Sequence, residues 1–199
     1  MRLFFAIDLP DDFRGPFAAL QDDLAAAEGL NFTDPEQAHL TMKFLGDVPV
    51  GATADADVSP TDDEGPTVSD AKAAGAAAVD AADLDPFEVE VGGLGAFPSE
   101  EYISVVWAGV RDGAADVESL AAALETEATD RGFAEADHPF TPHVTLARMN
   151  DARGKNLVQD RLRNTDPTVG RFTAEELRLK RSVLGDDGAE HETIARFPL

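Results

Sequence analysis

The stretch HLTMKFLG, residues 39–46, places a histidine, an apolar residue and a threonine in succession, and PFTPHVTLAR, residues 139–148, contains the same order. Polar and apolar residues alternate in both stretches, which predicts two half-buried β-strands. Side chains two residues apart on a strand point to the same face. Each strand is therefore expected to offer one imidazole and one hydroxyl to one side, and to pack its apolar residues on the other.

Three of the four histidines are followed by threonine two residues later, more often than thirteen threonines in 199 residues would give by chance. Two of these pairs, His39 with Thr41 and His143 with Thr145, enclose an apolar residue. The third pair begins at His191 and encloses a glutamate, which would put a carboxylate on the packing face. We therefore interpret His191 as an ordinary strand histidine.

Two such strands facing each other would bring two imidazoles and two hydroxyls together. A neutral histidine can take a proton from a nucleophile while a protonated one gives a proton to a leaving oxygen. Hydroxyls can donate hydrogen bonds to non-bridging oxygens as charge develops there. Cleavage of a phosphodiester needs these groups. The alternative, two core histidines without a catalytic role, is disfavoured by the identical flanks of His39 and His143. His138 precedes a proline and is expected in a loop.

Outward from these strands, helices and strands alternate along the whole chain. Strands are predicted at 3–7, 39–47, 86–98, 102–110, 140–148, 171–184 and 191–199, and helices at 11–28, 70–83, 113–132 and 151–164. Each half of the chain contains one His-x-Thr strand of the apolar type. We expect an α+β fold that is bilobal: two pseudo-symmetric lobes, each with an antiparallel-rich sheet and helices outside, and an active-site cleft between the lobes.

Residues 49–69 contain almost no large apolar side chain and are rich in Pro, Gly, Asp, Ser and Thr. Such a segment cannot bury a core face, so it is predicted to be an acidic flexible insertion at the surface. The remaining sequence has the length and apolar content of one large domain, and we take 1–199 as a single domain of two intertwined lobes.

The composition excludes several classes of function. The chain has no cysteine, which rules out disulfides, thiol catalysis and cysteine-based metal sites. It has no glycine-rich phosphate-binding motif, so neither a nucleoside triphosphate nor a dinucleotide cofactor is expected. The first apolar run, Leu3–Ile7, is too short for a signal sequence or a membrane span. We expect a cytoplasmic protein without a membrane partner, and nothing in the sequence marks an obligate oligomer, so a monomer is expected.

The net charge of −23 arises from 39 acidic and 16 basic residues. Self-repulsion of this size is best tolerated where salt screens it, because the Debye length falls to about 3 Å at 1 M. A surface rich in Asp and poor in Lys resembles that of proteins from salt-loving organisms; recruitment of a cation or a basic partner is the alternative. Such a chain repels nucleic acid at long range, so a phosphate site would have to be a local basic pocket.

The paired stretches, together with MRLFFAIDLP at 1–10 and RFPL at 196–199, resemble the signatures of the two-histidine (2H) phosphoesterases. The RNA 2′,3′-cyclic phosphodiesterase branch, also called the LigT-like or 2′-5′ RNA ligase family, is the most similar. The resemblance implies a bilobal fold with a pseudo-twofold axis. It also implies hydrolysis of an RNA-terminal 2′,3′-cyclic phosphate to a 2′-phosphate, without a metal or other cofactor.

On this resemblance, His39 is expected to be the proton donor to the departing 3′ oxygen and His143 the proton acceptor that activates water. Approximate twofold symmetry makes these roles exchangeable. Thr41 and Thr145 would bind the phosphate oxygens.

Two basic residues follow the motifs at different spacings. Lys43 lies four residues after the first histidine, which places it on the cleft face of a regular strand. Arg148 lies five residues after the second, so a regular strand would direct it away unless the strand bulges or ends. We expect both to contact the substrate. Phe44 and Phe140 could stack a base, although core packing is the expected role.

The segment RLKRS, 178–182, is the most basic part of the chain and could follow an RNA backbone. Three further functions stay open at this point. An RNA ligase would run the same chemistry backwards with a 5′-hydroxyl in place of water. A non-catalytic protein could bind RNA ends. A metalloprotein is disfavoured because neither motif has a carboxylate at ligand spacing.

Overall fold

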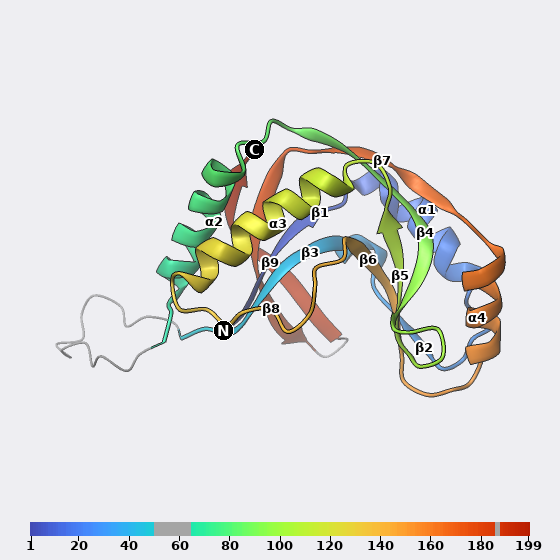
Figure 1. Cartoon of the computed structure of the whole chain (residues 1–199). Coiled ribbons are helices and arrows are strands. Elements are labelled where there is room, and N and C mark those ends of the chain that lie inside the picture. The colour runs from blue at the N-terminus through green and yellow to red at the C-terminus, as the bar shows by residue number, and fades with distance from the viewer. Residues whose placement is uncertain (50–64, 186–187) are drawn as a thin grey trace.

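One antiparallel sheet runs through the molecule and bends into an arch (Figure 1). The computed structural model describes residues 1–49, 65–185 and 188–199. Its strands are β1 (Arg2–Asp8), β2 (Leu30–Phe32), β3 (His39–Asp47), β4 (Phe87–Pro98), β5 (Ile103–Val110), β6 (His143–Met149), β7 (Thr168–Ala174), β8 (Glu176–Gly185) and β9 (Gly188–Pro198). Its helices are α1 (Arg14–Asp22), α2 (Val68–Ala82), α3 (Ala114–Thr129) and α4 (Lys155–Asn164), with 3₁₀ turns at Asp11–Phe13 and Pro35–Gln37.

The strand order β7-β4-β5-β6-β3-β1-β8-β9, with β2 beside β6, divides the sheet into two halves. We call β3-β1-β8-β9 the β3 half and β6-β5-β4-β7, with β2, the β6 half. The halves meet where β3 pairs with β6 at Leu40 and Val144. The predicted α+β class is therefore confirmed, although the two lobes share one sheet instead of having a sheet each.

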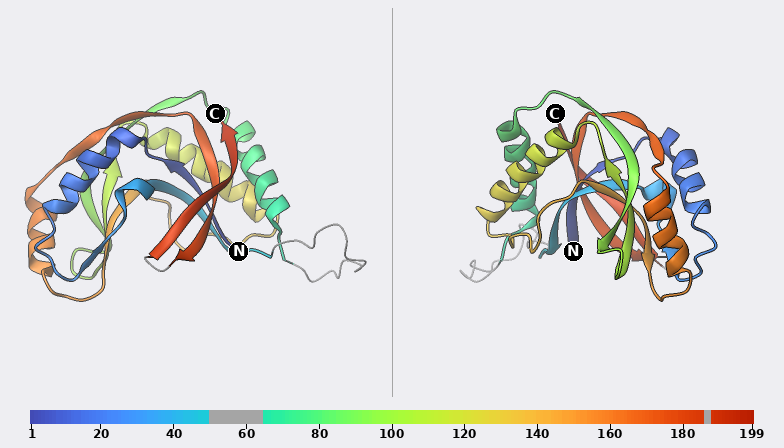
Figure 2. Two further views of the ribbon diagram at one scale, coloured as in Figure 1. Left: turned by 180° about the vertical axis from the view of Figure 1, so that it is seen from behind. Right: turned by 45° about the vertical axis from the view of Figure 1, so that its right-hand side comes forward.

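The helices cover the outer side of the arch (Figures 1 and 2). Two of them pack on the half of the sheet opposite to the strand that precedes them. Helices α2 and α3 pack together on the β3 half, while α1 and α4 pack on the β6 half. Yet α1 follows β1, a strand of the β3 half, and α3 follows β5, a strand of the β6 half. Each half thus receives a helix from the strand of the other half, which intertwines the two lobes.

The core lies between the helices and the sheet. Helix α3 buries the apolar stripe that its spacing predicts, including Leu120 and Leu124. Helix α2 is alanine-rich and lies close to the strands: a Cβ on Gly75 would approach the ring of Phe197 to 2.6 Å and that of Phe5 to 2.7 Å. A fully buried Leu or Phe contributes about 1.5–3 kcal/mol, so these helix faces hold the arch in shape.

Several predicted boundaries were wrong. The predicted strand at 171–184 is two strands, β7 and β8, which lie in different halves of the sheet. The predicted helix at 11–28 is shorter, and β2 was not predicted. Residues 68 and 69 of the predicted insertion belong to α2, which Thr67 and Asp70 cap with reciprocal hydrogen bonds. Residues 50–64 of that insertion lie outside the described residues. Among the described helices, none is long and apolar enough to cross a membrane.

Candidate active site

The two His-x-Thr motifs lie side by side at the middle of the sheet. Leu40 and Val144, the central residues of the motifs, are paired across β3 and β6 and are buried. Their neighbours along each strand therefore point to the opposite face, away from the helices. Because the strands are antiparallel, the histidine of each motif lies beside the threonine of the other. The two histidines are diagonal neighbours, a relation that in general separates residues by about 7–8 Å.

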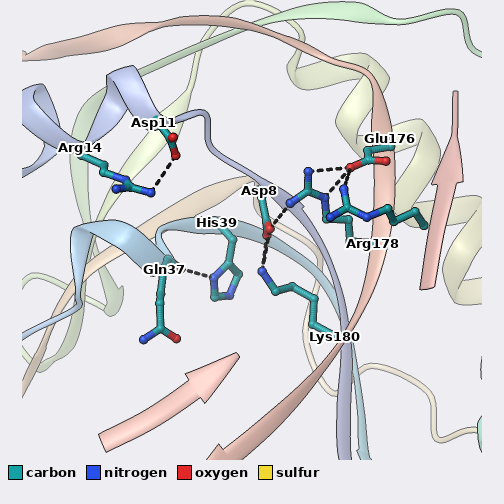
Figure 3. Close-up of polar contacts among 9 residues, drawn as sticks. Asp8, Asp11, Arg14, Gln37, His39, Glu176, Arg178 and Lys180 are labelled. Atoms are coloured by element: carbon teal, nitrogen blue, oxygen red, sulfur yellow. Dashed lines mark hydrogen bonds and ion pairs between the residues drawn. The ribbon is translucent and has the colours of Figure 1, made fainter. Parts of the chain in front are cut away.

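Each histidine is oriented by the carbonyl two residues before it. Nδ1 of His39 lies 2.7 Å from the carbonyl oxygen of Gln37 (Figure 3), and Nδ1 of His143 lies 2.8 Å from that of Thr141. A carbonyl oxygen can only accept, so Nδ1 carries the proton in both bonds. In its neutral form each imidazole then has its lone pair on Nε2, which can accept a proton.

Both strands bulge at the same place after the threonine. The register of β3 against β1 shifts between Thr41 and Lys43, and the register of β6 against β5 shifts between Thr145 and Ala147. Burial over the first seven residues of the two strands is identical, position by position. A bulge adds one residue and reverses the face of every residue after it. The fifth residue after each histidine therefore returns to the face of the motif.

The bulge makes the prediction for Lys43 wrong. Lys43 lies on the helix side of the sheet and is only 6% exposed. Its Nζ donates hydrogen bonds to Glu125 of α3, at 2.6 Å, and to the carbonyl of Ala134, at 3.0 Å. Burial would raise the pKa of Glu125, but the Lys43 ammonium holds it below its ordinary value. Lys43 thus fastens α3 to the sheet.

The equivalent bulge in β6 brings Arg148 to the face of His143, and the side chain of Arg148 is exposed. Phe44 takes the equivalent position after His39; it is 64% exposed and lies 5.9 Å from the ring of Phe4. Core packing was the wrong expectation for Phe44, whereas Phe140 does pack against the core. An aromatic ring and a guanidinium therefore occupy matching positions in the two halves.

The surroundings of His39 are rich in polar groups (Figure 3). Asp8 of β1 is its cross-strand partner. Lys180 of β8 donates to both carboxylate oxygens of Asp8, at 2.6 and 2.7 Å, and Arg178 also pairs with Asp8. Burial would raise the pKa of Asp8, but Lys180 and Arg178 hold it below its ordinary value. His191 of β9 lies against His39, with ring centroids 5.3 Å apart.

The surroundings of His143 are aromatic. The ring of Phe97 meets it edge to face, with centroids 4.9 Å apart, and Trp107 lies 6.0 Å away. The indole of Trp107 lies over Gly95, where an added Cβ would approach it to 2.1 Å. Glycine at 95 therefore leaves the space that the indole occupies.

Burial lowers the pKa of both histidines. For His39 the value falls to about 4, with smaller contributions from the Gln37 carbonyl and Asp8, which raise it, and from His191 and Lys180, which lower it. For His143 burial also has the largest effect; the Thr141 carbonyl raises the pKa and Arg148 lowers it. Both rings are therefore neutral at pH 7 in the free protein. A phosphate anion placed against them would raise both pKa values.

The basic segment at 178–182 does not present free cations. Arg178 and Lys180 share a face, as predicted, but both are paired with Asp8, and Arg178 also with Glu176. Arg181 is paired with Glu192. Within residues 1–49, 65–185 and 188–199, no three His, Asp or Glu side chains form a group that could hold a metal ion.

Sequence reasoning missed Asp8 as a neighbour of the motifs, and it favoured core packing for Phe44 and an ordinary strand position for His191. Asp8 could have been found, because it ends the first strand of the β3 half with a charge after a fully apolar run. His191 carried the His-x-Thr signal and was set aside because of Glu192. Phe44 could be found only by anticipating the bulge.

A family model described as the 2′-5′ RNA ligase superfamily matches residues 9–186. A protein of Methanothermobacter thermautotrophicus named RNA 2′,3′-cyclic phosphodiesterase is 30% identical over 203 residues, covering 100% of this chain and 99% of the relative. A protein of the same name from Aeropyrum pernix is 30% identical over 182 residues, covering 90% and 93% of the two chains.

Solved structures have the same fold. A Thermus thermophilus protein superposes with a TM-score of 0.70 at 28% identity, covering 100% of this chain and 98% of that one. LigT of E. coli, solved with 3′-AMP, superposes with a TM-score of 0.72 at 24% identity, covering 100% and 97%. At that identity the second likeness concerns the fold alone.

Proposed function

The chain belongs to the 2′-5′ RNA ligase superfamily, and from this premise we propose that it is an RNA 2′,3′-cyclic phosphodiesterase. Its substrate would be an RNA that ends in a 2′,3′-cyclic phosphate, and its product an RNA with a 2′-phosphate and a free 3′-hydroxyl. The names of the curated relatives support this activity.

The observation that carries the proposal is the matched pair of motifs on one face of the sheet. Two imidazoles with Nδ1 fixed by a backbone carbonyl offer two Nε2 atoms to one substrate. Two threonine hydroxyls lie beside them, each next to the histidine of the other strand. This arrangement matches an in-line displacement at phosphorus, in which a base and an acid act on opposite sides of one phosphate.

In the reaction, Nε2 of His143 accepts a proton from water as the water oxygen bonds to phosphorus. The bond from phosphorus to the 3′ oxygen breaks, and Nε2 of His39 donates its proton to that oxygen. Thr41 and Thr145 donate hydrogen bonds to the two non-bridging oxygens, whose charge grows in the transition state. The 2′ ester bond stays intact, and no metal or cofactor takes part in these steps.

For His39 to act as the proton donor, binding of the substrate has to favour its protonated form. With its pKa near 4, the free protein holds little protonated His39 at pH 7. The anionic phosphate and the developing charge on the 3′ oxygen would both favour the imidazolium. The exchanged assignment, with His143 as donor, uses the same geometry and predicts the same products.

Two further side chains complete the proposed site. Arg148 projects from the face of the motifs and would pair with a phosphate oxygen of the RNA, which gives the acidic chain a local positive charge. Phe44, exposed at the matching position in the β3 half, would stack a base of the terminal nucleotides.

The test is hydrolysis of a short RNA with a terminal 2′,3′-cyclic phosphate, in high salt with EDTA. The wild type is expected to open the ring to a 2′-phosphate, and both His39→Ala and His143→Ala to lose at least about 100-fold in kcat, the usual contribution of an acid or base. Loss of activity with EDTA, or full activity in either variant, would contradict the proposal.

If the cyclic phosphate stays closed, the reverse reaction, RNA joining, is assayed next. A second RNA with a 5′-hydroxyl is added, and joining through a 2′-5′ linkage would identify a ligase. Tight binding without turnover would identify an RNA-end binding protein. Either result would replace the hydrolase.

The proposal also covers the oligomeric state and the cellular location of the enzyme. We propose a monomer of one domain, 1–199, that works in salty cytoplasm. The charge of −23 supports the salt requirement.

A further inference from the structure

His191 stands in a cluster of three rings with His39 and Phe4. Its centroid lies 5.3 Å from that of His39 at an interplanar angle of 90°, and 5.0 Å from that of Phe4 at 78°. Phe4 in turn lies 5.1 Å from His39. His39 therefore packs against an aromatic ring from β1 and an imidazole from β9, and these two rings also contact each other.

A second link joins His191 to His39 through Gln37. The backbone N–H of His191 donates to the side-chain oxygen of Gln37 at 2.9 Å. The backbone carbonyl of Gln37 accepts from Nδ1 of His39 at 2.7 Å. The strand that carries His191 thus also holds the residue that fixes the tautomer of His39.

Among the described residues, Nδ1 of His191 is buried and has no hydrogen-bond partner. The charged groups that act on both His191 and His39 are Asp8 on β1 and Lys180 on β8. Burial has the largest effect on His191 and lowers its pKa; Lys180 lowers this pKa further, while Asp8 and the Glu190 backbone raise it. The ring of His191 is therefore mostly uncharged at pH 7.

The β6 half has a ring in the corresponding role. Phe97 meets His143 edge to face, with centroids 4.9 Å apart and an interplanar angle of 84°. Phenylalanine cannot titrate, so its function there is contact alone. The nearly equal geometry of the His191–His39 pair indicates that contact with a neutral ring is also what His39 requires.

Resting on the proposed function, we propose that His191 is a positioning residue for His39. Its uncharged ring, together with Phe4, forms the wall that keeps Nε2 of His39 directed at the substrate phosphate. His191 itself does not exchange a proton with the substrate.

The kinetic test compares His191→Ala with His191→Phe, and uses His138→Ala as the matched control, because His138 is an exposed loop histidine. Loss of the wall should lower kcat at least about tenfold while KM changes less than about threefold, since a misplaced catalytic group costs up to about 100-fold. Phe restores the ring, so His191→Phe should recover most of the lost rate. The control should match the wild type.

The second readout is the titration of His39 by ¹⁵N NMR of the labelled imidazoles, which needs no substrate. In His191→Ala water reaches His39, so its pKa should rise, while His191→Phe should keep it low. If Ala prevents folding, His191→Leu fills the space without a flat ring; it is expected to lower kcat as Ala does but, because it excludes water, to keep the pKa of His39 low.

An unchanged kcat in the Ala or Leu variant, or an unchanged His39 titration in the Ala variant, would overturn the inference while leaving the hydrolase intact. A His191→Phe variant as slow as Ala would also overturn it, because the imidazole would then act chemically. If the wild type itself lacks activity, the proposed function fails, and the NMR comparison still decides whether His191 positions His39.

Discussion

At the scale of single residues, the two histidines are alike in the bond that fixes them and unlike in what surrounds them. Both donate Nδ1–H to the carbonyl two residues earlier. His39 is surrounded by titratable groups, whereas His143 is surrounded by Phe97 and Trp107. The pKa of His39 therefore depends more on the charges of neighbouring groups than the pKa of His143 does.

The pH dependence of kcat/KM follows from the lowered pKa values. The proposed reaction needs one histidine protonated and one neutral in the free enzyme, so the expected optimum lies between their two pKa values. The pKa of His39 is about 4, and the pKa of His143 is below its ordinary value of 6.5. We expect kcat/KM to peak in this acidic range and to fall as the pH rises toward 8. The profile of kcat should lie at higher pH, because bound phosphate raises both pKa values. An optimum of kcat/KM above pH 7 would contradict the lowered values.

At the scale of secondary structure, the paired bulges decide which side chains lie on the face of the two motifs. Lys43 and Arg148 follow their motifs at almost the same distance along the chain, yet Lys43 is buried against α3 and Arg148 is exposed on the face of the two motifs. Replacing them should therefore affect different properties of the enzyme.

Arg148→Ala should raise KM for the cyclic-phosphate RNA at least about tenfold, the effect of a charged contact worth about 1.5–3 kcal/mol, and leave the melting temperature unchanged. Lys43→Met should do the reverse: it breaks the pair with Glu125 and lowers the free energy of unfolding by about 1–3 kcal/mol. Arg181→Ala removes an exposed cation paired with Glu192 and controls for charge alone. Equal effects of the Arg148 and Arg181 variants on KM would refute the bulge argument.

The bulge in β6 is supported from α1 by a buried glutamine. Nε2 of Gln21 donates to the carbonyl of Leu146, at 3.0 Å, and to that of Thr33, at 2.7 Å. Gln21→Leu should lower the free energy of unfolding by about 1–3 kcal/mol, because two carbonyls lose a donor. Gln159→Leu, which removes an exposed bond to the Glu100 carbonyl, should cost clearly less. Urea unfolding of both variants checks this, and equal losses would show that Gln21 has no special role.

The alternation in the sequence suffices to place His39 with Thr41 and His143 with Thr145, because period-two patterns report one strand and its two faces. It cannot report a bulge, since the extra residue is defined by the strand that pairs with it. For the same reason the run at 171–184 reads as one strand, although its ends pair with β4 and β1 in different halves. The closeness of His191 to His39 depends on the position of β9, which no local pattern encodes.

At the scale of the whole molecule, the charge of −23 opposes the compact state. Salt shortens the Debye length from about 10 Å at 0.1 M to about 3 Å at 1 M, so repulsion between surface carboxylates fades. We expect the melting temperature to rise by several degrees or more from 0.1 to 2 M KCl, and equally in NaCl. Scanning calorimetry in both salts measures this. A melting temperature independent of salt would mean that the acidic residues do not destabilise the protein.

The crossing of α1 and α3 between the halves has a consequence for how the protein folds as it is synthesised. Strand β1 lies between β3 and β8, and β8 is made long after β1 and β3. The β3 half therefore stays open until α3, β8 and β9 have been made, whereas the β6 half receives α1 before its own strands are made. Pairings between distant segments slow folding and leave strand edges unprotected for longer. We therefore expect the β3 half to be completed after the β6 half.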